Sequence, residues 1–313
     1  MNFATFIRIT IFSGIAVWGL VADVCRAATP EASPVPRKAF VDPKALKLLT
    51  STPATPDAPP PVHLANISTR LAVGTGDNVL IAGFTITGSQ QKRIMLRALG
   101  PLLPVNENLA DPTLELHDSS GATIAVNDNW RDTQQDEVKA TTIPPANDYD
   151  SSIVKSLTPG AYTAVLGGKG ATTGVGVLEV YDLDLTVDSK LANISTRGRV
   201  DQGDNVLIAG TIVLGNGTTT VLFRALGPSL PSGIANRLED PTLELHDGQG
   251  GVVATNDNWE DTQKDAIQQT TIPPSHPREA AILTSLSPGA YTAVVRGKNN
   301  GTGVAVVDAY QLN

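Results

Sequence analysis

Short apolar segments separated by turn residues recur along the chain from residue 63 onward and predict β-strands. The segment Leu114-Glu-Leu-His117 alternates cleanly, so a strand here would turn its two leucines toward a core and its Glu and His toward solvent. The segment Val79–Ile86 is apolar on both faces and rich in β-branched residues, which is typical of a central strand. A helical period is confined to a turn or two around Gln134–Lys139 and Ser151–Leu157. The pattern therefore predicts an all-β protein of packed antiparallel sheets.

An internal duplication organises these segments. Leu64–Arg70 returns unchanged as Leu191–Arg197, an offset of 127 residues (191 − 64), and Pro112–Asp118 returns at 241–247. A repeat of this length indicates a duplicated domain, because solenoid units are only about 20–50 residues long. We therefore expect two tandem antiparallel β-sandwich domains of jelly-roll-like form, at residues 63–185 and 190–313, joined by a short link.

The N-terminal region has the pattern of an export signal followed by a spacer. Arg8 precedes an apolar run, and Cys25-Arg-Ala27 offers a small-residue cleavage site, so residues 1–27 are expected to be a secretory signal peptide. Lipidation of Cys25 is the less favoured alternative, because Asp23 and Val24 stand where small residues are expected. Residues 28–62 are rich in Pro and Ala and predict an extended linker. The protein is expected to be secreted, to an extracellular or periplasmic location.

Composition narrows the classes of partner. The chain has 31 Asp and Glu against 23 Lys and Arg, a formal net charge of −8, and shows no basic stripe, so we expect no nucleic-acid partner. A single cysteine excludes a disulfide scaffold and a multi-cysteine metal site. The N-terminal apolar run is shorter than the ~20 residues of a membrane-spanning helix, so no span is expected in the mature chain.

The repeated motifs resemble a known group of bacterial sequences. The series LANISTR, GDNVLIAG, RALGP, DPTLELHD, NDNW and LxPGAYTAV, read through residues 64–313, is similar to an uncharacterised tandem repeat in secreted proteins of Verrucomicrobia and related bacteria. The second half of each copy, at 112–182 and 241–310, more distantly resembles bacterial pre-peptidase C-terminal domains through its LxLxD strand, Asn/Asp loop and Pro-Gly-x-Tyr turn. Such domains are jelly-roll-like, non-catalytic sandwiches, some of which bind calcium and some polymeric substrates. The resemblance implies an accessory module.

Asn and Asp residues gather at one loop of each copy and form a candidate calcium site. Ca²⁺ prefers six to eight oxygen ligands, which carboxylate and amide side chains on a tight loop can supply. We expect a hairpin to bring the two groups of each set to the same edge. The alternative is that these residues build turns through side-chain to backbone hydrogen bonds. The candidate ligands are Asp118, Asn127, Asp128, Asn129 and Asp132 in the first copy and Asp247, Asn256, Asp257, Asn258 and Asp261 in the second.

Trp130 and Trp259 lie in the same loops and are the candidate ligand-binding residues. An exposed indole ring would stack on a sugar, whereas a buried ring would anchor the loop on the sandwich, and the second role is favoured. The duplicated His117 and His246 each precede an Asp, but no Gly-x-Ser-x-Gly nucleophile motif accompanies them.

These observations predict a secreted, non-catalytic module for binding, adhesion or structure, stabilised by calcium, which recognises a polysaccharide or another polymer at a surface or in the environment. Two alternatives stay open. One is a secreted hydrolase that uses the His/Asp edge. The other is a surface protein that self-associates through exposed strand edges.

Overall fold

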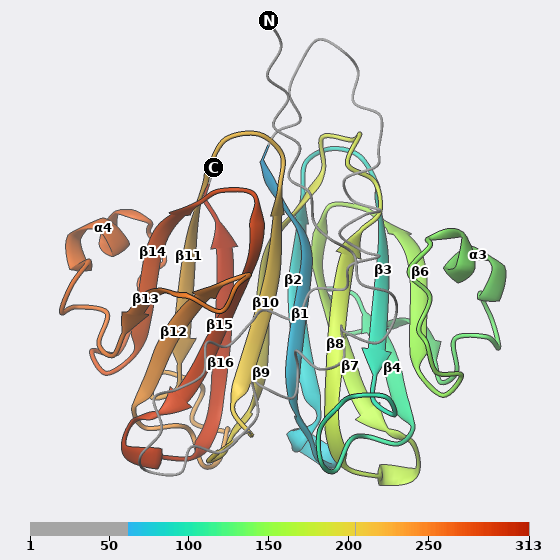
Figure 1. Cartoon of the computed structure of the whole chain (residues 1–313), viewed down its shortest axis with the longest axis horizontal. Helices are drawn as coiled ribbons and strands as arrows, with labels where there is room; N and C mark the ends of the chain where they lie inside the picture. The colour runs from blue at the N-terminus through green and yellow to red at the C-terminus, as the bar shows by residue number, and fades with distance from the viewer. Residues whose placement is uncertain (1–61, 204, 313) are drawn as a thin grey trace, which may run out of the picture.

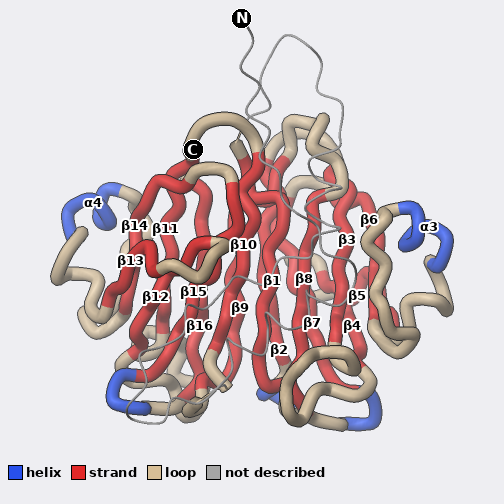
Figure 2. Tube along the Cα trace, viewed as in Figure 1, coloured by secondary structure: helices blue, strands red, loops and turns tan. Residues whose placement is uncertain are grey.

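The computed structural model describes residues 62–203 and 205–312, and nearly all of its regular structure is antiparallel strand (Figures 1 and 2). In the first repeat the strands are β1 (His63–Val73), β2 (Leu80–Thr87), β3 (Lys92–Leu99), β4 (Pro112–His117), β5 (Thr123–Asn127), β6 (Ser151–Leu157), β7 (Gly160–Gly168) and β8 (Gly174–Asp182). In the second they are β9 (Lys190–Val200), β10 (Leu207–Leu214), β11 (Thr219–Leu226), β12 (Pro241–Asp247), β13 (Val252–Asn256), β14 (Ala280–Leu286), β15 (Gly289–Gly297) and β16 (Gly303–Gln311). The expected all-β fold is confirmed. The expected signal peptide and most of the expected linker lie outside the described residues.

Helical structure in these residues is brief. It comprises α3 (Gln135–Ala140), α4 (Lys264–Gln269) and the single 3₁₀ turns η1 (Gly76–Asn78), η2 (Lys169–Ala171) and η3 (Lys298–Asn300). The helical turn expected near Gln134–Lys139 is α3, but the one expected at Ser151–Leu157 is wrong, because that segment is β6 and pairs along its whole length with β3. Tertiary pairing decided its conformation. No helix within the described ranges is long and apolar enough to cross a lipid bilayer.

The hydrogen bonds between strands cross from one repeat to the other. One path of neighbours runs β13-β12-β15-β10-β1-β8-β3-β6, and another runs β14-β11-β16-β9-β2-β7-β4-β5. The two layers lie face to face, with β1 over β2 and β12 over β11 (Figure 1). Each layer therefore takes half of its strands from each repeat.

Each repeat forms a sandwich from its own eight strands, and the two sandwiches join edge to edge in both layers. The first strand of each repeat lies at this junction: β1 pairs with β8 of its own repeat and with β10 of the second, and β9 pairs with β16 of its own repeat and with β2 of the first. A single apolar cluster runs through the interior and contains buried residues of both repeats, from Leu64 to Ala309. Because burial of apolar surface drives folding, this shared core stabilises the contact between the two repeats.

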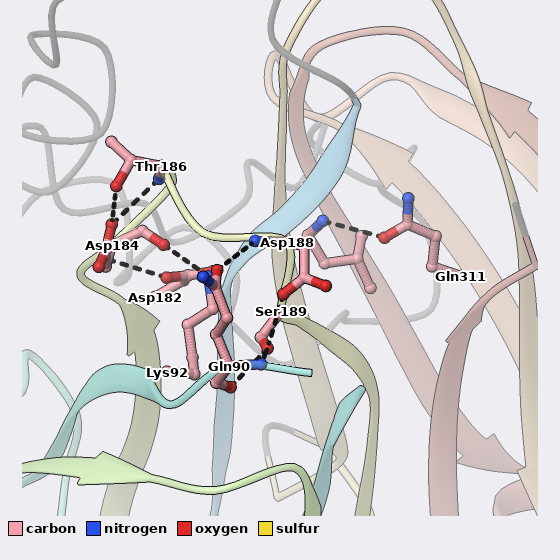
Figure 3. Close-up of polar contacts among 9 residues, drawn as sticks. Gln90, Lys92, Asp182, Asp184, Thr186, Asp188, Ser189 and Gln311 are labelled. Carbon is pink, nitrogen blue, oxygen red and sulfur yellow. Dashed lines mark hydrogen bonds and ion pairs between the residues drawn. The ribbon is translucent and has the colours of Figure 1, made fainter. Parts of the chain in front are cut away.

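The link between the repeats is held by side chains at the end of the β2–β3 hairpin (Figure 3). Lys92 and Asp182 form an ion pair of 2.9 Å in which each side chain is only 1% exposed, and Lys92 Nζ also donates to the carbonyl of Asp184 at 2.5 Å. The Ser189 hydroxyl donates to the Gln90 carbonyl at 2.5 Å and accepts from the Gln90 amide at 3.0 Å. These contacts fix the path from β8 in one layer to β9 in the other.

Candidate functional site

The β4–β5 hairpin separates the two groups of candidate calcium ligands. Its register pairs Leu114 with Asn127 and His117 with Thr123, so Asn127 lies beside the start of β4. Asp118 lies beyond the end of β4, at the turn. The two strands of a hairpin run in opposite directions, so the end of β5 lies beside the start of β4. At a rise of ~3.4 Å per residue, the length of β4 separates Asn127 from Asp118. The expectation that both groups meet at one edge is therefore wrong.

Asp118 is a turn-building residue. Its Oδ1 accepts hydrogen bonds from the Ser120 amide and hydroxyl and from the Ala122 amide. The Ser120 hydroxyl, followed by its amide, holds the pKa of Asp118 below its ordinary value. Asp247 repeats the arrangement and accepts from the amide of Gly251. Side-chain to backbone bonding of this kind accounts for an Asp at both positions.

Asn127 and Asn256 close the open edge of the facing layer. Asn127 Oδ1 accepts from the Ser152 amide on edge strand β6 at 2.8 Å, and its Nδ2 donates to the Asn129 carbonyl at 3.1 Å. Asn256 does the same with the Ala281 amide on β14 at 2.9 Å. Both side chains are buried, and these hydrogen bonds give them a structural role, while their expected role as metal ligands stays a prediction.

A glutamine completes the closure of each edge, which sequence reasoning missed. Gln134 accepts from the Val154 amide and donates to the Val154 carbonyl, as a neighbouring strand would. Gln263 makes the equivalent pair with Leu283. A side-chain amide therefore occupies backbone groups that an edge strand would otherwise offer to another strand.

An acidic cluster with a lysine at its centre lies at the open end of the β4–β5 hairpin. Lys169 Nζ lies 2.6 Å from Asp128 Oδ2 and 3.8 Å from Asp111 Oδ2. Its hydrogen bond to Asp128 raises the pKa of Lys169. Asn129 donates to the neighbouring Asp132 at 3.1 Å. Asp111 was not among the expected ligands, although its place just before β4 is the position that a hairpin brings beside the end of β5.

The second repeat has the same cluster. Lys298 Nζ lies 2.6 Å from Asp257 Oδ2 and 4.0 Å from Asp240 Oδ2, and Asn258 donates to Asp261 at 2.9 Å. In each copy, Oδ1 atoms of the acidic pair are buried and have no hydrogen-bond donor among the described residues. The described residues hold no group of three or more His, Cys, Asp or Glu suited to a metal ion. Calcium binding stays a prediction, and Lys169 and Lys298 already supply positive charge to these carboxylates.

The two tryptophans anchor an excursion from the sandwich, which we call the cap. The first cap is residues 128–150 and the second is 257–279, and their helices α3 and α4 lie at opposite ends of the molecule (Figure 1). Trp130 is 2% exposed and its Nε1 donates to the Asn147 carbonyl at 3.0 Å, while Trp259 is 5% exposed and donates to the His276 carbonyl at 3.2 Å. These rings are buried anchors, and they offer no face to a ligand in this structure.

An arginine from the Arg-Ala-Leu-Gly-Pro motif lies beneath each cap, and its side chain is 3% exposed in the first repeat and 12% exposed in the second. Arg97 contacts Glu179, donates to the Ile143 carbonyl of the cap at 2.8 Å, and donates to the Tyr181 hydroxyl at 2.9 Å. Its guanidinium carbon lies 5.0 Å from the centre of the Tyr181 ring. In the second repeat Arg224 pairs with a buried aspartate, and desolvation raises the pKa of that residue, Asp308. Each arginine thus ties a cap to its sheet through charge-assisted hydrogen bonds.

The two histidines of the proposed His/Asp edge pair with glutamates. His117 Nε2 lies 3.0 Å from Glu115 Oε2, and His246 Nε2 lies 3.2 Å from Glu244 Oε2. His117 Nδ1 is also within 3.2 Å of the Thr123 hydroxyl. Each pair joins alternate residues of one strand. His117 is partly exposed, whereas His246 is buried, so the solvent-facing position expected from strand alternation does not hold for His246.

Comparison with known proteins adds no family. No family model matches the chain, and no curated protein matches it. Among solved structures, the chain is similar to a plant receptor-like kinase, FER, over 80% of this chain and 88% of that chain, at 9% sequence identity and a TM-score of 0.18. A TM-score at that level carries no argument about fold or function.

Proposed function

We propose that this chain is a secreted, non-catalytic module that binds a polysaccharide or a similar polymer through its first cap. The observation that carries the proposal is Tyr149, whose side chain is 58% exposed on that cap. The Arg131–Asp148 ion pair, at 2.5 Å, stands on the same cap. An exposed aromatic ring beside charged hydrogen-bonding groups has the chemistry that stacks on a sugar ring and binds its hydroxyls.

The rigidity of the cap supports this proposal. Trp130 fixes it to the sheet by apolar packing, and Gln134 and Arg97 do so through hydrogen bonds, so Tyr149 is presented on an ordered surface. A preorganised surface loses less conformational entropy on binding than a flexible one. The second cap has Arg278 at the position equivalent to Tyr149, so the aromatic surface belongs to the first cap.

A pull-down with insoluble cellulose, chitin and bacterial cell-wall sacculi tests the proposal. The full chain should be retained on at least one of these polymers, and Tyr149→Ala should reduce the retained fraction several-fold. Leu102→Ala is the matched control, because Leu102 is 45% exposed in the same repeat but lies outside the cap. Absence of retention on all three polymers, or equal loss in both variants, would contradict the proposal.

A second candidate function, self-association, is favoured by the strands at the opposite edges. Strands β5 and β13 each pair on one side only, with β4 and β12, and they carry the exposed side chains of Val126 (62%), Val252 (63%) and Val253 (42%). Apolar edge strands of this kind can pair with another chain.

Light scattering distinguishes this candidate from the first. Self-association through these edges predicts a mass that rises with concentration and returns to that of a monomer in a Val126→Lys, Val252→Lys double variant. A constant monomer mass at high protein concentration would remove it, without bearing on polymer binding by Tyr149.

A further inference from the structure

Equivalent residues of the two repeats meet at the centre of the molecule. Thr69 and Thr196 share a hydrogen bond of 2.8 Å between their hydroxyls, and Leu64 pairs with Leu191. In both pairs the partners are separated by the repeat offset of 127 residues. A residue that contacts its own equivalent lies on a pseudo-twofold axis, so this axis passes between β1 and β9.

One pair of equivalent residues on these strands breaks the symmetry. Leu71 on β1 corresponds to Gly198 on β9, and both are buried. A Cβ atom placed on Gly198 would lie 1.6 Å from Leu71 Cδ2 and 2.9 Å from Leu71 Cγ. Gly198 is in extended backbone that any residue adopts, so space is the reason for glycine at this position. The leucine of one repeat occupies the place that the other repeat leaves empty.

A second pair of equivalent residues is also large in the first repeat and small in the second. Phe84 on β2 is 1% exposed and stacks on Tyr162, with ring centres 5.6 Å apart. Its equivalent on β10 is Thr211, whose hydroxyl donates to the Asn66 carbonyl on β1 at 3.1 Å. The first repeat therefore contributes the large side chain and the second the small one at both positions.

We infer that Leu71 and Gly198 make the interface between repeats selective for an unlike partner, so that a first repeat accepts a second repeat and rejects another first repeat. Two first repeats would bring two Leu71 side chains into one space. Two second repeats would leave a cavity between two Gly198 residues, and each unfilled core volume destabilises the assembly. The backbone pairings of β1 with β10 and β9 with β2 are otherwise equivalent, so volume at the axis supplies the discrimination.

The full chain with a protease site inserted after Thr186, an exposed residue of the link, tests partner choice. After cleavage the two halves should stay together at the mass of the intact protein. After unfolding and refolding of the cleaved mixture, native mass spectrometry should find unlike pairs well above the half expected from random pairing. Random pairing, or separation of the halves without denaturant, would overturn the inference.

Two variants of the same cleaved chain test whether Leu71 and Gly198 cause the preference for unlike pairs. Leu71→Gly leaves glycine in both repeats, and the fraction of unlike pairs should fall toward the random value. The reciprocal exchange, Leu71→Gly with Gly198→Leu, restores one large and one small residue and should restore the preference.

Thermal unfolding of the intact chain keeps the inference testable where the cleaved halves do not refold. Leu71→Gly and Gly198→Leu should each lower the midpoint by about 10 °C, the first through a cavity and the second through overlap with Leu71. The reciprocal exchange should recover most of the loss. If the exchange lowered the midpoint by the sum of the two single losses, the two side chains would not be complementary at the axis, and the inference would be contradicted.

Discussion

Removal of the Trp130 ring is the sharpest test of how the cap is held. The ring is 2% exposed and packs with Met95 and Tyr181 of the sheet and with Val138 and Ile143 of the cap. Replacement of a buried Trp by Ala costs about 3–5 kcal/mol through lost burial and the cavity left behind. This cluster is separate from the main core, so we expect the substitution to destabilise the cap more than the sandwich.

Hydrogen exchange measures that expectation directly. In Trp130→Ala the amides of α3 should lose protection while those of β1 and β9 keep it, and α4 serves as the internal reference. Trp130→Phe keeps most of the apolar contact but loses the hydrogen bond to the Asn147 carbonyl, so it should cost only about 1 kcal/mol.

A matched variant in the second repeat completes the design. Trp259→Ala should deprotect α4 and leave α3 unchanged, because each indole anchors only its own cap. If Trp130→Ala lowered the unfolding free energy by less than about 1 kcal/mol and left α3 protected, the anchoring role would be refuted.

Three further outcomes follow from other parts of the structure. Burial raises the pKa of Asp150 to about 6. The folded state therefore binds its proton more tightly than the unfolded chain, so this group's contribution to stability rises as pH falls from 7 to 5, by about 1–2 kcal/mol. Denaturant unfolding at the two pH values should show that increment reduced in Asp150→Asn. Thr142 has a left-handed φ of 65°, as does Thr271. Thr142→Gly should therefore raise the unfolding free energy by about 1 kcal/mol, whereas Thr142→Ala should not. A lower unfolding free energy with glycine would exclude backbone strain at this position. If calcium binds at the acidic clusters, melting in millimolar CaCl₂ should exceed melting in chelator, and Asp128→Asn should remove only the first-repeat share of the shift; equal midpoints would eliminate calcium.

Local sequence chemistry determined a large part of this protein. Alternation of apolar and polar residues identified the β4 strand at Pro112–His117, and the duplicated motifs placed matching strands in both halves. The turn at Asp118 was also predictable, because its hydrogen bonds reach only two and four residues along the chain. Such features depend on neighbours in sequence, where spacing alone defines the geometry.

Long-range pairing decided the rest. The pairings of β1 with β10 and of β9 with β2 across the repeats join segments far apart in the chain. The pairing of Ser151–Leu157 with β3 and the contact of Leu71 with Gly198 do the same. A local pattern states that a segment will be buried in a sheet, but many registers and partners satisfy the same pattern. Which partner a strand takes depends on how all the side chains fill one common interior, and only the folded chain resolves that.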